Sequence, residues 1–190
     1  MLPRGRQANG PHPPAPPESA LRALAIRSLW DGRPALAAEY ADLTLTDGGA
    51  DLLVAIDAPF HGDPPPPHPV GRTPALWEHE VVELFIAGPG ERYIEVEVGP
   101  RGHFLAYALD GVRRVVDPAL PVHVVTAIMG GSWTARVRLP RALLPPGPHR
   151  ANAYAIHGVG PSRRHLAAAG APGPAPDFHR LDTFLPLELP

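Results

Sequence analysis

The chain contains no cysteine and no lysine among its 190 residues. Without thiols it cannot form disulfide frameworks, thiolate zinc sites, iron–sulfur clusters, a cysteine nucleophile or thiolate haem ligation. Without lysine it has no Schiff-base or P-loop lysine, and all 17 basic residues are arginines. A domain of this size buries roughly 70% of the surface of its unfolded chain, so it needs neither disulfides nor a structural metal to fold.

Excess charge and long apolar runs are also missing. The 17 basic and 19 acidic residues give a net charge of -2, and without a basic run there is no electrostatic footprint for nucleic acid. No stretch approaches the ~20 apolar residues of a membrane helix, and residues 1–17 lack the apolar core of a signal peptide. We therefore expect a soluble, cytoplasmic protein with no nucleic-acid or membrane partner.

Proline and glycine are abundant, and their placement marks the domain. The 28 prolines crowd into residues 3–17, 59–74, 140–148 and 161–176. Because proline cannot donate to a strand ladder, the proline-free runs between them, rich in Val, Ile, Phe and Tyr, are typical of strands. We predict a disordered proline-rich tail over residues 1–20 and one β-sandwich domain over residues 21–190.

The clearest alternation lies on the two sides of the turn at residues 88–91. One face is apolar, and the other carries glutamates between apolar and aromatic side chains. The apolar face holds Val82, Leu84, Ile86, Ile94, Val96 and Val98; the other holds Val81, Glu83, Phe85, Tyr93, Glu95 and Glu97. This pattern predicts a β-hairpin.

Further strands are predicted at residues 21–29, 36–45, 51–58, 104–109, 121–128, 133–139, 152–158 and 180–187. A short helix after Ser19 is the alternative for the first of these. About nine strands at this spacing indicate an all-β fold: an antiparallel, two-sheet β-sandwich of immunoglobulin or jelly-roll type.

The block from Leu76 to Gly102 combines a tryptophan, an acidic strand and a Pro-x-Gly turn, and it resembles the DOMON-like superfamily that includes carbohydrate-binding module family nine. Ala58-Pro59-Phe60, Asp63-Pro64-Pro65, Ala155-Ile156-His157-Gly158 and Pro176-Asp177-Phe178-His179 resemble an uncharacterised family of small proteins found from bacteria to vertebrates. The resemblance covers about residues 30–187. It implies a DOMON-like fold, whose members bind sugars or haem, and implies no activity.

The register of the hairpin decides which glutamates meet. If paired residue numbers sum to 178, Glu83 lies opposite Glu95; if they sum to 180, it lies opposite Glu97. Two bare carboxylates ~5 Å apart on neighbouring strands destabilise a sheet. Arginine partners, a shared proton that raises one pKa, or a hard cation such as calcium would compensate.

Arginine is the first of these alternatives. Arg136 and Arg138 alternate with the apolar residues of the strand at 133–139, so both leave the face opposite its apolar stripe. If that strand joins the same sheet, the two guanidinium groups neutralise the glutamates and form an ionic lattice that has no function of its own.

Metal and haem chemistry rank lower. Glu83 and Glu95 are the metal candidates, with calcium ranked below arginine pairing because no Asp-rich loop of EF-hand type is present. His79 and Glu83 cannot share an ion, because four residues along a strand span ~13 Å. A haem needs histidine or methionine ligands in an apolar pocket, and nothing favours one here. We expect no resident cofactor.

The leading hypothesis is a non-catalytic, small-ligand binding surface, with carbohydrate as the ligand class. Aromatic faces stack on sugar C–H surfaces while charged groups bind hydroxyl pairs. His157 is expected to face the same side as Ala153 and Ala155, with Tyr154 and Ile156 in the core. The predicted binding residues are Trp77, Glu83, Tyr93, Glu95, Glu97, Tyr107, Trp133, Arg136, Arg138 and His157.

The alternative hypothesis is a small enzyme. Glu83 paired with Glu95 or Glu97 would supply acid and base, and His157 or His179 a second proton carrier, for glycoside hydrolysis, isomerisation or cyclisation. A catalytic pair requires one carboxyl that titrates near neutrality, whereas a binding surface of ionised pairs does not. No Gly-x-Ser-x-Gly elbow or Gly-rich phosphate loop is present.

Overall fold

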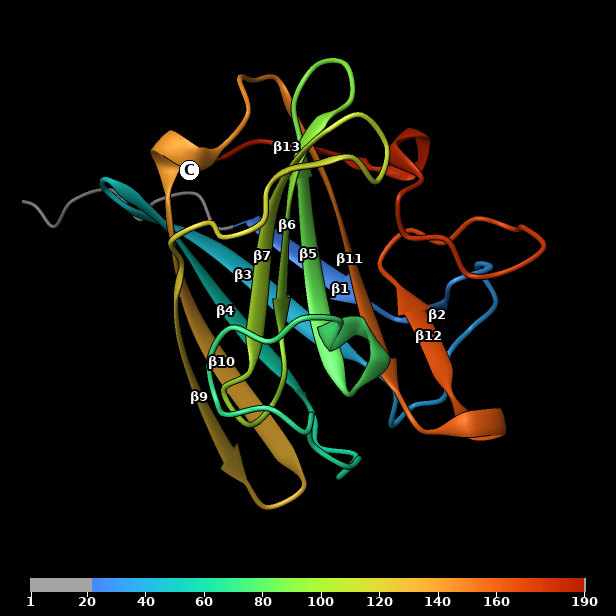
Figure 1. The fold of residues 1–190 in the computed structure, drawn as a ribbon. Coiled ribbons are helices and arrows are strands. Elements are labelled where there is room, and N and C mark those ends of the chain that lie inside the picture. The colour runs from blue at the N-terminus through green and yellow to red at the C-terminus, as the bar shows by residue number, and fades with distance from the viewer. Residues whose placement is uncertain (1–21, 190) are drawn as a thin grey trace, which may run out of the picture.

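The computed structural model describes residues 22–189, so the predicted tail over residues 1–20 lies outside the described residues. Within the described range, thirteen strands form two antiparallel sheets, as the sequence predicts (Figure 1). Four single 3₁₀ turns accompany them: η1 (Leu76–Glu78), η2 (Arg141–Leu143), η3 (Gly160–Ser162) and η4 (Leu181–Thr183).

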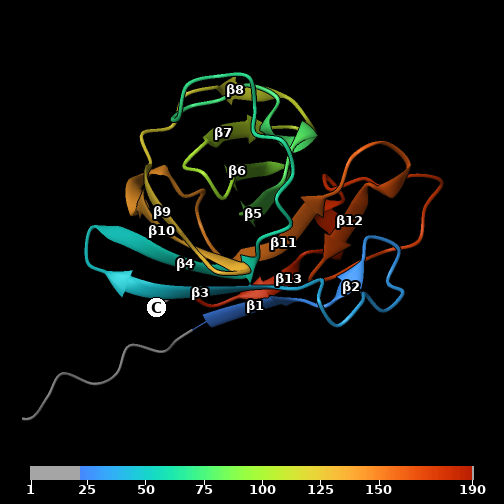
Figure 2. The same cartoon turned by 90° about the horizontal axis from the view of Figure 1, so that it is seen from below.

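The five-stranded sheet has the order β1 (Arg22–Ile26), β3 (Ala41–Gly48), β4 (Asp51–Pro59), β10 (Ser132–Pro140) and β9 (His123–Met129). The eight-stranded sheet has the order β2 (Ser28–Leu29), β12 (Arg164–Ala167), β11 (His149–His157), β5 (Val81–Ala87), β6 (Arg92–Val98), β7 (Phe104–Asp110) and β8 (Val115–Asp117), and β13 (Leu185–Leu187) also pairs with β11. Figure 2 shows β8, β7, β6, β5 and β11 as one continuous row.

The core between the sheets follows from two-residue alternation. In β3 the inward residues Leu43 and Leu45 are fully buried, while the intervening threonines are half-buried. They belong to one apolar cluster with Leu84 of β5 and Val96 of β6 from the other sheet. Each such aliphatic side chain contributes ~1.5–3 kcal/mol relative to exposure. The two sheets are therefore held together by apolar burial.

The eight-stranded sheet is covered on both faces. Every residue of β5 is buried, including those that point away from the sandwich core. A second apolar cluster lies on that outer face and joins Phe85 and Tyr93 to Phe178 and Phe184 of the C-terminal segment. A carboxyl group on the outer face of β5 or β6 therefore stands in a covered space.

Several predicted strand bounds need correction. The strand predicted at 36–45 begins at Ala41, because Leu36 and Glu39 close a turn in which the Leu36 N–H donates to the Glu39 carboxylate. The strand predicted at 180–187 shrinks to β13 behind the turn η4. The first predicted strand is confirmed as β1 and β2. The structure has more strands than the nine predicted because several of its strands are only two to four residues long.

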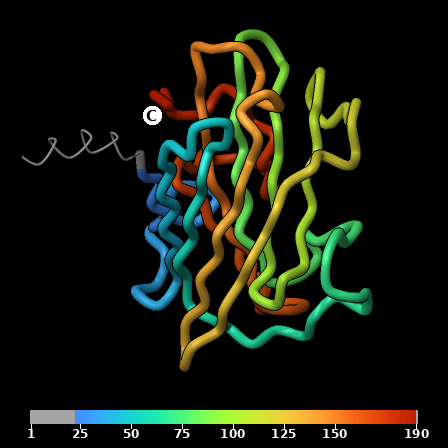
Figure 3. The backbone as a smooth tube through the Cα atoms, turned by 90° about the vertical axis from the view of Figure 1, so that its left-hand side faces the viewer, coloured from blue at the N-terminus to red at the C-terminus, as the bar shows by residue number. Residues whose placement is uncertain are grey.

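The proline-rich connection at residues 60–75 joins β4 of one sheet to the η1 turn and β5 of the other, and Figure 3 shows it passing around one end of the molecule. Its first residues are fixed by Glu80, whose carboxylate accepts backbone N–H groups from His61, Gly62 and Asp63 at 2.8–3.1 Å. It delivers Trp77 of η1 to the outer face of the eight-stranded sheet.

Candidate functional site

A cavity of about 790 Å³ opens on the outer face of the eight-stranded sheet. Its volume lies in the range of small-molecule sites. The η1 turn, β5, β6, β7, β11 and the segments around β8, β12 and 176–179 contribute its walls. The lining residues are Trp77, Glu78, Glu83, Glu95, Tyr107, Leu109, Arg113, Val115, Ile156, Arg163, His165, Pro176, Phe178 and His179.

Three buried glutamates form the carboxyl cluster of this site: Glu83 on β5, and Glu95 and Glu97 on β6. Glu83 pairs directly with Glu97, so the register sum of 180 is confirmed and the sum of 178 is wrong. Their exposed fractions are 2%, 5% and 0%. No hydrogen bond of good geometry reaches Oε1 of Glu83 or either carboxyl oxygen of Glu97 from the described residues, although the Glu95 carboxyl and the Trp77 backbone lie close enough to Glu97 to influence its pKa. Buried polar atoms without partners are rare, and each calls for an explanation.

The surroundings of the cluster favour the protonated form of each carboxyl group. Burial raises the pKa of Glu95 to about 7. Burial, and then the nearby charge of Glu95, raises the pKa of Glu83 well above its usual range. Burial and the charges of Glu83 and Glu95 do the same for the pKa of Glu97. Desolvation and like charge both disfavour the ionised form, and they act together here.

The two arginines that line the cavity bind elsewhere. Arg113 donates to the carboxylate of Asp177 at 2.8 Å, and Arg163 donates to the backbone carbonyls of Trp77 and Glu78. Their charges only partly oppose the upward pKa shifts of Glu95 and Glu83. Within residues 22–189, no ion pair joins an arginine to the carboxyl cluster.

Aromatic rings form the wall. Trp77 is 42% exposed although it is a large apolar side chain, so a flat ring faces the opening of the cavity. Phe178 stacks on Tyr154 with ring centroids 4.0 Å apart and an interplanar angle of 8°. This contact anchors the segment at residues 176–179 against β11.

Tyr93 and His179 form a polar pair beside the cluster. Tyr93 Oη lies 2.7 Å from His179 Nδ1 and accepts the backbone N–H of Arg113 at 2.9 Å. Burial, aided by the charge of Arg113, lowers the pKa of His179 to about 4. The imidazole is therefore neutral at pH 7. It borders the cavity as a hydrogen-bonding group and not as a cation.

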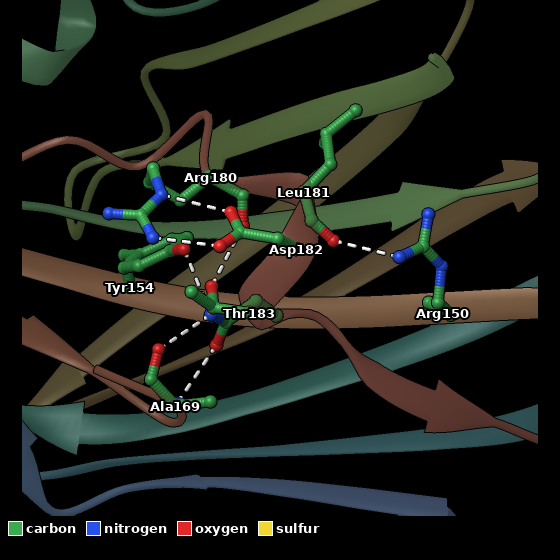
Figure 4. Close-up of polar contacts among 8 residues, drawn as sticks. Arg150, Tyr154, Ala169, Arg180, Leu181, Asp182 and Thr183 are labelled. Carbon is green, nitrogen blue, oxygen red and sulfur yellow. Dashed lines mark hydrogen bonds and ion pairs between the residues drawn. The ribbon is translucent and has the colours of Figure 1, made fainter. Parts of the chain in front are cut away.

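The C-terminal wall is fastened to β11, as Figure 4 shows. The buried amide of Asn152 donates to the Ala169 carbonyl at 2.8 Å and accepts the Ala169 N–H at 3.0 Å. Arg150 donates to the carbonyl of Leu181 at 2.9 Å. These bonds hold the chain on both sides of the segment that carries the phenylalanine and histidine of the wall.

Three predicted binding residues lie on β10, away from the cavity. β10 pairs with β4 and β9 in the five-stranded sheet, so Arg136 and Arg138 point away from the site and the predicted arginine pairing of the glutamates is wrong. Arg138 instead binds Asp51. Trp133 is buried in the core between the sheets. The structure does bring together Trp77, Glu83, Tyr93, Glu95, Glu97, Tyr107 and His179.

His157 does not line the cavity either, and the prediction of which face of its strand packs in the core is wrong. Ala153 and Ala155 lie in the core between the sheets, while Tyr154 and Ile156 belong to the cluster on the cavity side. The His157 ring stacks on His61 with centroids 3.6 Å apart. Its Nε2 lies 3.4 Å from Glu39.

Sequence reasoning missed Arg113, Arg163 and His165. Arg113 sits in the turn after β7 with a positive φ of 60°, and Arg163 follows the turn η3. Both lie in loops, where period-two alternation gives no information on direction. The paired arginines at 113–114 and 163–164 were the only available signal.

Sequence comparison identifies relatives over most of the chain. No family model matches. The UPF0462 protein C4orf33 homolog of Danio rerio is 36% identical over 168 residues, which cover 84% of this chain and 85% of the relative. The chain belongs to the UPF0462 family. The human UPF0462 protein C4orf33 is 34% identical, with 84% of each chain covered.

Solved structures place the UPF0462 fold among carbohydrate-binding module-like sandwiches. A candidate carbohydrate-binding protein from Bacteroides uniformis superposes with a TM-score of 0.69 at 14% identity, covering 87% of this chain and 84% of that one. A carbohydrate-binding module of family 9 from Caldicellulosiruptor kristjanssonii, in complex with cellotriose, gives a TM-score of 0.54 at 11% identity, covering 78% and 73%. These likenesses establish the fold.

The helices in the described part of this UPF0462 chain are single 3₁₀ turns. None of its helices is long and apolar enough to cross a membrane. Across residues 22–189, no group of three or more histidine, aspartate or glutamate side chains is arranged to hold a metal ion. Calcium at Glu83 and Glu95 stays a prediction.

Proposed function

We propose that the cavity on the outer face of the eight-stranded sheet binds a small carbohydrate. The observation that carries this proposal is the combination of an open aromatic ring, Trp77, with buried carboxyl groups that have unused hydrogen-bonding capacity, Glu83 foremost. A sugar offers both complements: C–H faces that pack on rings and hydroxyl groups that pair with carboxyl oxygens.

The protonation of the cluster suits this ligand class. A neutral carboxyl both donates and accepts hydrogen bonds, as a hydroxyl does. Glu83 and Glu95 line the cavity with raised pKa values, so they can satisfy sugar hydroxyls of either polarity without placing full charges in a covered space. Related folds in complex with cellotriose and with glucose support the same ligand class.

Isothermal titration with glucose, galactose, xylose and cellotriose tests the proposal. We expect at least one sugar to bind the wild type, and Trp77→Ala to weaken that affinity about tenfold, since a lost ring contact of ~1.4 kcal/mol corresponds to that factor. Arg136→Ala is the control, because this exposed arginine lies on the other sheet. Binding by none of the four sugars would refute the proposal.

A second experiment tests whether the cluster binds a cation. Thermal melts of the sugar-free protein with calcium and with EDTA test the predicted metal candidates Glu83 and Glu95. A calcium-dependent rise in melting temperature that Glu95→Gln abolishes would make the cluster a cation site instead, because a ligand of the folded state stabilises by mass action.

A further inference from the structure

We propose that the same cavity opens and closes the ring of the sugar that it binds, with Glu95 as the base and Glu83 as the acid. The inference rests on the proposed carbohydrate site and adds a chemical step to it. The reaction class is proton transfer at a hemiacetal, which interconverts the anomers of a free aldose.

The register supplies the geometry. Glu97 stands directly opposite Glu83, so Glu95, two residues along β6, is the diagonal neighbour of Glu83 on the same face. Diagonal neighbours lie ~7–8 Å apart between strands, within reach of long side chains. Both residues line the cavity, whereas Glu97 does not. A sugar between the two carboxyl groups can present its hemiacetal carbon to both.

The unpartnered atom points to a ligand. Oε1 of Glu83 is buried and bonded to nothing in the described part of the chain. Leaving such an atom unsatisfied costs ~1–3 kcal/mol. A carboxyl retained in this position without an arginine or a hydrogen-bond partner is suited to a bound molecule that completes its bonding.

The pKa values of the two carboxyl groups indicate which is the base and which is the acid. Glu95, whose pKa is about 7, is partly ionised at neutral pH and can accept a proton. Burial and then the charge of Glu95 raise the pKa of Glu83 well above its usual range, which favours the protonated form that an acid needs. Two carboxyls whose environments push their pKa values apart mark the acid and the base. Besides burial, Glu95 and Arg163 set the pKa of Glu83, and Glu97 and Arg113 set that of Glu95. The titratable groups Tyr93 and Tyr107 also lie within the field of Glu95.

The step balances without a co-reactant. Glu95 removes the proton of the anomeric hydroxyl, the freed electron pair forms the carbonyl bond, the bond from the anomeric carbon to the ring oxygen breaks, and the ring oxygen takes the proton of Glu83. After rotation of the aldehyde, the ring oxygen attacks its other face. The two protons then return to Glu83 and to the new anomeric hydroxyl, which restores both carboxyl groups to their starting states.

The rest of the chain fits acid–base chemistry of this kind. It contains no lysine that could trap the open-chain aldehyde as a Schiff base. His179 is neutral beside the cluster because burial lowers its pKa to about 4, so it adds no positive charge that would fix both carboxyls in the ionised form.

Polarimetry of freshly dissolved α-D-glucose, α-D-galactose and α-D-xylose at pH 7 tests the step, with buffer alone as the spontaneous rate. We expect a rate of anomer exchange that increases linearly with protein concentration for the sugars that bind. Glu95→Gln should reduce the protein-dependent rate at least 100-fold while titration still detects sugar binding. Glu91→Gln, in the exposed turn after β5, should match the wild type.

Two results separate the proposals. A sugar that binds the wild type without faster anomer exchange would overturn the catalytic step and leave the binding site standing. Absence of binding by these three sugars and by cellotriose would overturn both. The pH profile is a further readout: the rate should rise as the pH passes about 7, where Glu95 ionises, and a flat profile would contradict the assignment of the base.

Discussion

Glu83 of β5 and Glu97 of β6 face each other across the sheet, both buried and neither paired with an arginine. Opposed ionised carboxylates would destabilise this pair of strands. The pKa values of both groups are raised well above their usual range by burial and like charge, and protonation lessens that repulsion because a protonated carboxyl carries no charge. The sheet therefore tolerates the cluster in its protonated form and is weakened as the pH rises.

The first prediction concerns Glu95→Gln and alkaline stability. The unfolded carboxyl ionises near 4.5 and the folded one near 7. Between these values the folded state binds more protons, so the free energy of unfolding falls as the pH rises from about 4.5 to about 7 and stays reduced above it. We expect the variant to exceed the wild type by up to about 3 kcal/mol at pH 8 and to match it at pH 4.5.

Urea denaturation at both pH values measures this difference, with Glu91→Gln as the matched exposed change. An equal difference between Glu95→Gln and the wild type at the two pH values would contradict the raised pKa.

The second prediction concerns Glu39→Gln and acid stability. Glu39 is buried and binds Arg164 through both oxygens at 2.7 and 2.9 Å, and this contact is the main cause that lowers its pKa to about 2. A lowered carboxyl pKa gives stability that is present above about 4.5 and is lost as the pH falls towards 2. Because Arg164 is about one-third exposed, we expect a loss of only about 2 kcal/mol at pH 6.

At pH 3 the gap between Glu39→Gln and the wild type should narrow. Asp42→Asn, which breaks the exposed pair with Arg27, serves as the comparison and should change the unfolding free energy by less than ~1 kcal/mol. A constant gap at pH 6 and pH 3 would count against the charge as the source of the effect.

The third prediction concerns Arg163→Ala. Arg163 ties the carbonyls of Trp77 and Glu78, so its loss should loosen the η1 turn that positions the ring and weaken sugar binding several-fold. The residue is partly exposed, and its removal should change the melting temperature little. Titration measures the sugar affinity of Arg163→Ala and of Arg136→Ala, which loses the same charge at a distant position. Equal affinities in these two variants would contradict a role of Arg163 in positioning the ring.

The fourth prediction concerns Asn152→Ala. The substitution leaves the N–H and carbonyl groups of Ala169 without their side-chain partner, and we expect the unfolding free energy to fall by about 3 kcal/mol. Trypsin should also cut faster after Arg180, since the segment over the cavity loses its anchor. Thr134→Ala on the exposed face of β10 is the control, and unchanged cleavage at Arg180 would rule out the anchoring role.

Alternation alone predicted the carboxyl cluster, because odd-numbered residues of the hairpin must share a face whichever even register holds. It failed for Arg136 and Arg138, because alternation assigns a face but not a sheet, and β10 joined the other one. It failed for His157 because both faces of β11 are buried, so hydrophobicity does not distinguish the core side. Loop residues such as Arg113 leave no periodic signal at all.

The eight-stranded sheet is covered on both faces, so the even-numbered and odd-numbered residues of β5 and β6 pack against different parts of the molecule. Val82, Leu84 and Val96 belong to the sandwich core, whereas Glu83 and Glu95 line the cavity on the opposite face of the same sheet. Substitutions at the odd positions can therefore change what the cavity accepts while the packing between the sheets stays as it is. The lining of the cavity can therefore vary among related sequences while the residues of the sandwich core stay the same.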